Sequence, residues 1–120
     1  MSIITLILAG IVALEHLYIK CLETFATHSD TTSRIFNMSK EELQRDFVTN
    51  LFKNQGIYNG LIAVFLLYGI FTNSQLLVTV FVLNVFFAAV YGAVTANKKI
   101  IFTQGGPAIL TLFSPIISLF

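Results

Sequence analysis

His16 and Glu23, two side chains that can exchange protons, stand seven residues apart in an otherwise apolar stretch of the sequence. Seven residues turn a helix by about 700°, so a helix here places both side chains on one face, whereas Glu15 is turned about 100° from His16. An imidazole and a carboxylate on one face can pass on a proton or bind a polar ligand. We therefore expect His16 and Glu23 to share a site, and Glu15 to point toward a neighbouring helix or a second copy of the chain.

Glu23 also has a structural interpretation, because Lys20 lies three residues before it and could neutralise its charge. An ionisable side chain inside a membrane costs roughly 2.5–3.5 kcal/mol or more, which makes each one a functional candidate by default. Both interpretations of Glu23 stay open. His16 lies deeper in the apolar stretch and has no basic partner, so a functional role is favoured for it.

Amides, a phenol and a glycine in the later stretches could hydrogen-bond the same ligand. Gln55 and Asn59 are four residues apart and share a helix face, as do Asn84 and Tyr91, which are seven apart. Tyr91 has an alternative role as an aromatic anchor at the membrane interface. Gly105 opens a Gly-Gly-Pro helix start whose free N–H groups favour an anion, although a plain helix start is the alternative. The predicted binding residues are His16, Glu23, Asn54, Gln55, Asn59, Tyr91, Gln104 and Gly105, with Glu15, Tyr18 and Asn84 as secondary candidates.

Several classes of chemistry lack a pattern in this sequence. The histidines are His16 and His28, which is too few for a convincing metal site, and the single Cys21 has no evident activating partner. No nucleophile elbow is present. We therefore predict no metal and no cofactor, and the catalytic residues, if there are any, stay unknown. A net charge of +1 without a basic stripe argues against nucleic-acid binding.

The composition indicates the elements that would hold these residues. Hydrophobic residues make up 56% and charged residues 11% of the 120-residue chain, against roughly 45–50% and 25% in soluble domains. Stretches such as "LIAVFLLYGIF" lack the polar face of a soluble helix. We predict an all-α, single-domain, four-span transmembrane helix bundle, with spans at about 3–25, 55–72, 75–97 and 103–120. The acidic residues in the first span and the absence of an earlier Lys or Arg argue against a signal peptide.

A further helix is predicted between the first two spans, over about 39–53. Ser39 followed by Glu42 is a capping-box pattern, typical of a helix start. Leu43, Phe47 and Leu51 recur every four residues and form an apolar stripe on a charged helix. We expect an amphipathic surface helix that lies flat on the membrane, or else a loop helix packed on the bundle.

The basic residues predict the orientation of the spans. Lys and Arg outside the spans fall in the first and third connections, at Arg34, Lys40, Arg45, Lys53, Lys98 and Lys99. The positive-inside rule therefore predicts cytoplasmic basic loops and both termini outside the inner cell membrane. In this orientation each span places its polar residues at the cytoplasmic side, where we expect a polar cleft.

Four motifs in order, "EHLYIKCLETF", "NQGIYNG", "VYGAVT" and "TQGGPAIL", resemble the small bacterial membrane proteins filed as domain of unknown function 1304. The resemblance covers nearly the whole chain, and residues 29–49 match least. It supports the membrane fold and the site, and it implies no chemistry. The family pattern falls on His16, Tyr18, Glu23, Asn54, Gln55, Gly56, Asn59, Gly60, Tyr91, Gly92, Gln104, Gly105 and Pro107.

Three functions follow as hypotheses. The first is a protein that binds or transports a small amphipathic molecule or lipid head group in the cytoplasmic-side cleft. The second is a membrane-embedded enzyme that uses His16 and Glu23 for proton transfer on a lipid-soluble substrate. The third is a structural subunit. The expected partners are membrane lipids and a second copy in a homodimer.

Overall fold

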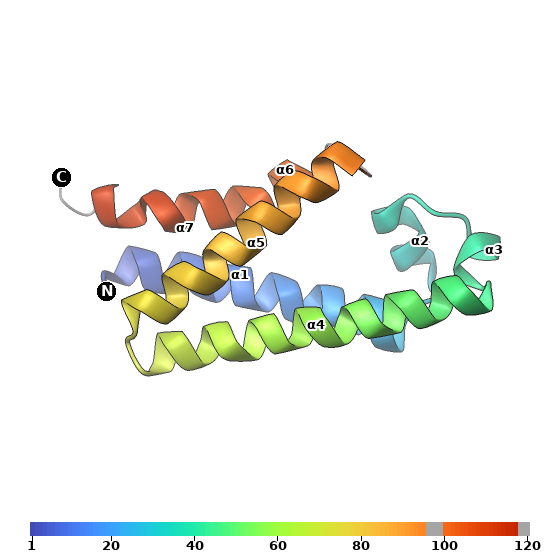
Figure 1. Cartoon of the computed structure of the whole chain (residues 1–120), viewed down its shortest axis with the longest axis horizontal. Coiled ribbons are helices and arrows are strands. Elements are labelled where there is room, and N and C mark those ends of the chain that lie inside the picture. The colour runs from blue at the N-terminus through green and yellow to red at the C-terminus, as the bar shows by residue number, and fades with distance from the viewer. Residues whose placement is uncertain (96–99, 118–120) are drawn as a thin grey trace. The chain divides into compact units, whose positions relative to one another are not determined.

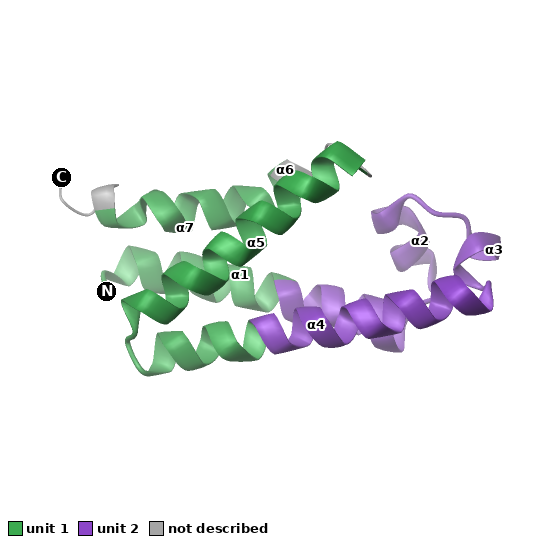
Figure 2. Ribbon diagram, viewed as in Figure 1, with its two compact units in different colours: residues 1–15, 63–120 green, residues 16–62 purple. Residues whose placement is uncertain are grey.

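The computed structural model describes residues 1–95 and 100–117, and these residues form helices and their connections (Figure 1). The chain divides into two compact units, residues 1–15 with 63–120 and residues 16–62 (Figure 2). The helices are α1 (Ile3–Lys20), the π-helix η1 (Cys21–Phe25), α2 (Asp30–Phe36), α3 (Lys40–Leu43), α4 (Asp46–Phe71), α5 (Gln75–Thr95), α6 (Ile100–Thr103) and α7 (Gly105–Ile117). The all-α fold class is therefore confirmed for the described residues.

Three of these helical segments are long and apolar enough to cross a membrane, namely residues 3–25, α4 and α5. Each buries only a minority of its apolar stretch within the protein, so large hydrophobic side chains such as Phe71, Phe87 and Val94 are exposed. Exposed apolar surface on this scale is typical of a lipid-facing helix. The predicted fourth span is represented by α7, whose 13 residues are shorter than the roughly 20 that a bilayer requires; residues 118–120 lie outside the described residues.

The unit of residues 1–15 and 63–120 contains the tight connection between α4 and α5. Asn73 adopts a left-handed backbone conformation with φ 53°, which asparagine tolerates in turns. The Ser74 hydroxyl then accepts a hydrogen bond from the backbone N–H of Leu77 and caps the start of α5. The "TNSQ" stretch is therefore a helix-to-helix turn, as its polar composition predicts. Within the same unit, buried Thr5 and Ser114 join α1 to α7 through a 2.6 Å hydroxyl–hydroxyl hydrogen bond.

The unit of residues 16–62 corrects the predicted surface helix over about 39–53. Ser39 does cap a helix start, because its hydroxyl accepts the backbone N–H of Glu42, yet this helix, α3, already ends at Leu43. A new helix, α4, begins at Asp46 and continues without a break to Phe71, so residues 46–53 belong to the helix of the second predicted span. The chain between Leu43 and Asp46 turns, and the Thr49 hydroxyl donates back to the Leu43 carbonyl at 2.6 Å.

This turn also breaks the predicted apolar stripe. Leu43 is fully buried, whereas Phe47 and Leu51 are 74% and 50% exposed on α4. Periodicity alone missed the interruption because a four-residue spacing is preserved in sequence even where the helix axis changes direction. Phe52 packs edge-on against Phe36 of α2, with ring centroids 5.1 Å apart.

The helix α2 was not predicted from the sequence. Ser29 caps its start by accepting the backbone N–H of Thr32, and Asn37 ends it with a left-handed φ of 54°. Lys40 of α3 forms an ion pair with Asp30 of α2, and this ammonium group lowers the pKa of the Asp30 carboxyl, which is exposed. The short helices α2 and α3 are thus connected by side chains as well as by the chain.

Candidate functional site

The site is built where the end of α1 and η1 run antiparallel to the beginning of α4, inside the unit of residues 16–62. A Cβ atom added to Gly60 would lie 3.0 Å from Lys20 Cδ, and one added to Gly56 would lie 1.9 Å from Thr24 Oγ1. The Gly56-x-x-x-Gly60 motif therefore lets the two segments approach closely, as expected of small residues between membrane helices. The Thr24 hydroxyl also donates to the Lys53 carbonyl at 3.2 Å.

Glu23 lies in the middle of this contact and is fully buried. The Asn59 side-chain amide donates a hydrogen bond from Nδ2 to Glu23 Oε1 at 2.5 Å. The second carboxyl oxygen, Oε2, is buried and has no hydrogen-bond partner among the described residues. Buried polar atoms are normally satisfied, so an unsatisfied carboxyl oxygen identifies a place where a proton or the donor group of a ligand belongs.

The local sequence turns Glu23 inward by forming a π-helix. The backbone N–H of Ala26 donates to the Cys21 carbonyl, a five-residue hydrogen bond of 3.0 Å. Single π-helical turns inside α-helices are frequent at functional sites. Threonine hydroxyls satisfy the carbonyls at its end: Thr27 donates to the Glu23 carbonyl at 2.6 Å, and Thr32 donates to that of Ala26 at 2.7 Å.

Sequence reasoning missed these threonines. Thr24, Thr27 and Thr32 hold the π-helix and its contact with α4, although none was named as a site residue. The available signal was the density of hydroxyl residues after Glu23, in the segment "TFATHSDTT". Hydroxyl side chains bond nearby backbone carbonyls and amides, so such a run predicts an irregular, side-chain-capped segment.

The structure separates the predicted amides of α4. Asn59 lies beside Gly56 and Gly60 on the buried side of the helix and reaches Glu23. Asn54 and Gln55 are exposed, and they make no hydrogen bond with Glu23. Their predicted role in binding therefore rests on the sequence pattern alone.

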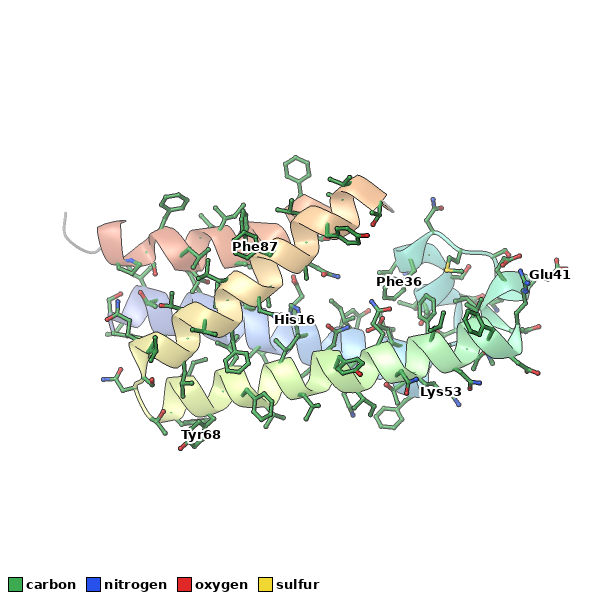
Figure 3. All side chains as sticks on the ribbon, viewed as in Figure 1. His16, Phe36, Glu41, Lys53, Tyr68 and Phe87 are labelled. Carbon is green, nitrogen blue, oxygen red and sulfur yellow. The ribbon has the colours of Figure 1, made fainter. Side chains whose placement is uncertain are left out.

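Three of the predicted site residues lie on α1 and η1. His16, labelled in Figure 3, is buried at 3% exposed. Glu23 is also buried, while Tyr18 is 53% exposed. Burial of both His16 and Glu23 agrees with one inward-facing side of this segment. Tyr18, a secondary candidate, has its ring on the outer surface and contributes no hydrogen bond to Glu23.

The remaining candidates belong to the other unit. Glu15 is half-buried, and its Oε1 atom is buried with no hydrogen-bond partner among the described residues. Asn84 and Tyr91 are exposed on α5, and Gln104 with Gly105 marks the start of α7. The convergence of these residues with Glu23 in one cleft stays a prediction.

The arrangement limits the chemistry of this site. Across residues 1–95 and 100–117, no three His, Cys, Asp or Glu side chains gather in a way that could hold a metal ion. A buried carboxyl group held at one oxygen can keep a proton, give it up, or accept hydrogen bonds from an ammonium or hydroxyl group. The geometry around Glu23 therefore suits recognition of a hydrogen-bond donor or transfer of a proton.

Comparisons with known proteins confirm the resemblance of the chain to an uncharacterised family. Residues 10–116 match the family model described as "Protein of unknown function (DUF1304)". The chain is also similar to the "Uncharacterized protein YpaA" of Lactococcus lactis subsp. lactis (strain IL1403), with 59% identity over 116 residues that cover 95% of this chain and 98% of that protein. No solved structure matches the chain.

Proposed function

Because the chain belongs to the DUF1304 family, whose function is unknown, we propose a function from the site itself: the protein binds or transports a small amphipathic molecule or lipid head group, with Glu23 as a ligand contact. The observation that carries this proposal is the buried Oε2 atom of Glu23, which has no partner among the described residues. An unsatisfied buried polar group costs about 1–3 kcal/mol, and more if it is charged. A ligand ammonium or hydroxyl group would remove this penalty.

The setting of Glu23 favours a ligand that is part polar and part apolar. Glu23 lies on η1 and is hydrogen-bonded to α4. It is near the end of a segment, residues 3–25, that is long and apolar enough to cross a membrane. A molecule reaching this carboxyl group from the bilayer needs a polar head for Glu23 and apolar groups for the surrounding helices. A lipid head group meets both requirements.

The proposed topology places this site in the cytoplasmic leaflet. We propose four spans, the fourth at α7, with both termini outside the inner cell membrane. The basic residues Arg34, Lys40 and Arg45 in the connection before α4, and Lys53 near its start, support this orientation. Glu23 and Asn59 then lie near the cytoplasmic ends of their spans, where the predicted polar cleft opens.

The experiment compares Glu23→Gln with Glu41→Gln. Glutamine at position 23 keeps the shape of the side chain and an oxygen that accepts the hydrogen bond from Asn59. Glu41 is exposed on α3, so Glu41→Gln controls for the loss of one negative charge. Native mass spectrometry of protein purified from membranes measures the retained lipid or small molecule. We expect wild type and Glu41→Gln to retain a ligand that Glu23→Gln loses by about tenfold or more. Retention by Glu23→Gln, or an empty wild-type protein, would overturn the proposal.

Burial of both His16 and Glu23 favours a second candidate, a membrane-embedded enzyme that transfers a proton on a lipid-soluble substrate. In this reaction one of the two residues removes a proton from the substrate and a proton is returned at another atom, as in an isomerisation. Comparison of membrane lipid species after expression of wild type and His16→Ala tests it. A wild-type-specific change in lipid species supports the enzyme, and identical lipids contradict it.

A further inference from the structure

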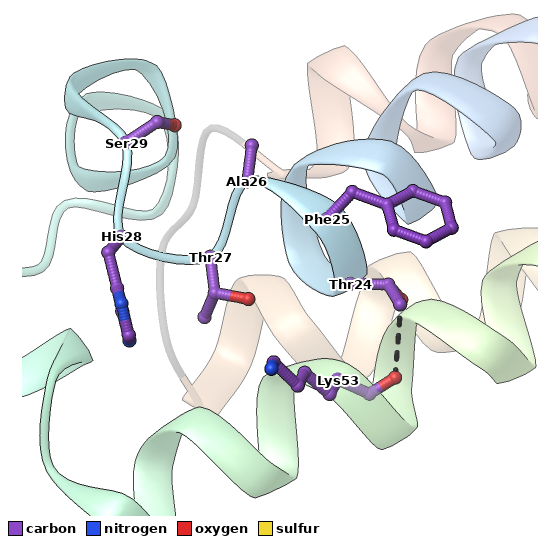
Figure 4. A pocket seen from close by; sticks show the side chains of 7 residues that line it. All are labelled: Thr24, Phe25, Ala26, Thr27, His28, Ser29 and Lys53. Atoms are coloured by element: carbon purple, nitrogen blue, oxygen red, sulfur yellow. Dashed lines mark hydrogen bonds between the residues drawn. The ribbon is translucent and has the colours of Figure 1, made fainter.

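A pocket at the end of η1 is lined by a lysine, a histidine and hydroxyl side chains. It has a volume of about 320 Å³, which lies within the roughly 300–1,000 Å³ of small-molecule sites. Its lining, drawn in Figure 4, contains one ammonium, one imidazole and three hydroxyl groups, and no carboxylate: Thr24, Phe25, Ala26, Thr27, His28, Ser29 and Lys53. The hydroxyl protons of Thr24 and Thr27 are donated to backbone carbonyls, so the ammonium group is the feature that favours an anion. We propose that this pocket binds an anionic group, a phosphate or carboxylate carried by a lipid head group or by a free anion.

Lys53 supplies the positive charge. Its ammonium group forms no ion pair with a carboxylate among the described residues, although Lys40 and Arg45, which precede α4, are both paired. The Lys53 backbone carbonyl accepts the hydrogen bond from Thr24, so α4 is fixed at this position independently of the lysine side chain. An unpaired ammonium on a fixed backbone lining a pocket is suited to capture an anion.

His28 is oriented by a hydrogen-bond chain. The Thr49 hydroxyl has one proton, which it donates to the Leu43 carbonyl at 2.6 Å. Thr49 Oγ1 must therefore accept at its 2.9 Å contact with His28, so His28 Nε2 carries a proton. The other ring nitrogen, Nδ1, has no hydrogen-bond partner among the described residues.

Phe25 adds an apolar surface at the same pocket. Its ring is 74% exposed, and the Lys20 ammonium lies 4.2 Å from the ring centroid in a cation–π contact. The pocket therefore combines an anion-selective interior with an exposed aromatic side chain, a combination suited to the head group of an anionic lipid. The inference goes beyond the proposed function, because Glu23 does not line this pocket, and either proposal can fail while the other holds.

The test uses the full chain in nanodiscs of neutral phosphatidylcholine, with the amide NMR signals of Thr27 and His28 as reporters. One series adds inorganic phosphate, and a second replaces phosphatidylcholine stepwise by phosphatidylglycerol. We expect a saturable shift that Lys53→Gln weakens by about tenfold or more. The matched control, Arg34→Gln, removes one positive charge on α2, outside the pocket, and should change the half-saturation point less than twofold.

The outcomes separate the sources of the anion. Saturation by phosphatidylglycerol but not by phosphate assigns the pocket to a lipid head group, and saturation by phosphate alone assigns it to a free anion. The proposal is overturned if neither series saturates, or if both variants weaken binding equally, which would indicate diffuse surface charge. Unchanged signals in the rest of the chain show that Lys53→Gln is folded.

Discussion

At the scale of the residue, the central feature is the Glu23 carboxyl group, of which only one oxygen has a hydrogen bond within the described residues. Asn59 provides the hydrogen bond to Oε1, and Oε2 is left for another donor. A purely structural carboxylate would be expected to have both oxygens paired, since a buried charge is stable only when hydrogen-bonded. Lys20, the predicted structural partner of Glu23, contacts the Phe25 ring, and no ion pair between Lys20 and Glu23 is found among the described residues.

The Asn59 amide therefore has a measurable effect on stability. Asn59→Ala leaves both oxygens of Glu23 buried without a protein partner, so we expect the free energy of unfolding to fall by about 1–3 kcal/mol. Chemical denaturation in detergent measures it. Asn54→Ala, an exposed amide five residues earlier on α4, should stay within about 0.5 kcal/mol of wild type. Equal stability of Asn59→Ala and wild type would show that the Glu23–Asn59 bond is not formed.

At the scale of the element, the contact of η1 with α4 depends on two glycines that differ in tolerance. At Gly56 a new Cβ would overlap the Thr24 hydroxyl at 1.9 Å, close to the backbone of η1. At Gly60 it would meet the flexible Lys20 side chain at 3.0 Å. The π-helix cannot shift freely, because the hydroxyl groups of Thr27 and Thr32 bond its carbonyls.

This difference predicts a graded response to alanine. Gly56→Ala should destabilise the protein by about 1–3 kcal/mol through overpacking, and Gly60→Ala by less, because the Lys20 side chain can move aside. Gly10→Ala is the control, since nothing lies within 4 Å of its new Cβ, and it should be neutral or stabilising through helix propensity. Thermal unfolding of the three variants measures the order.

A compensating change sharpens this prediction. Thr24→Ala in the Gly56→Ala background removes the overlapping hydroxyl and should recover part of the lost stability, whereas additive losses would show that the two residues are not in contact. The same double variant loses the bond from Thr24 to the Lys53 carbonyl, so full recovery is not expected.

At the scale of the whole molecule, the chain is a helical protein with three segments that can cross a membrane and a shorter helix, α7, at the position of the predicted fourth. If α4 and α5 both cross, Lys53, near the start of α4, and Lys98, after α5, lie on the same side of the membrane. A crossing by α7 then returns the chain to the other side. Four crossings place both lysines in the cytoplasm, as the positive-inside rule requires of basic connections.

Cysteine labelling in the Cys21→Ser background tests this topology. Lys53→Cys and Lys98→Cys should react with a membrane-impermeant maleimide in inside-out vesicles, and Gln75→Cys, at the start of α5, should react in right-side-out vesicles. Labelling of positions 53 and 98 from opposite sides would contradict the two crossings, by α4 and α5, that the four-span topology requires between them.

The sequence by itself determined the all-α class, the apolar segments, the family and the polar candidates on them, because hydrophobic length and residue periodicity are local properties. The family pattern also includes Gly56, Gly60 and Asn59, which the structure places in the contact of α4 with η1 and the end of α1. Only the tertiary structure decided that Asn59, rather than Asn54 or Gln55, bonds Glu23. The reason is that a π-helical turn, and the threonines that stabilise it through contacts up to ten residues away, set which way Glu23 points.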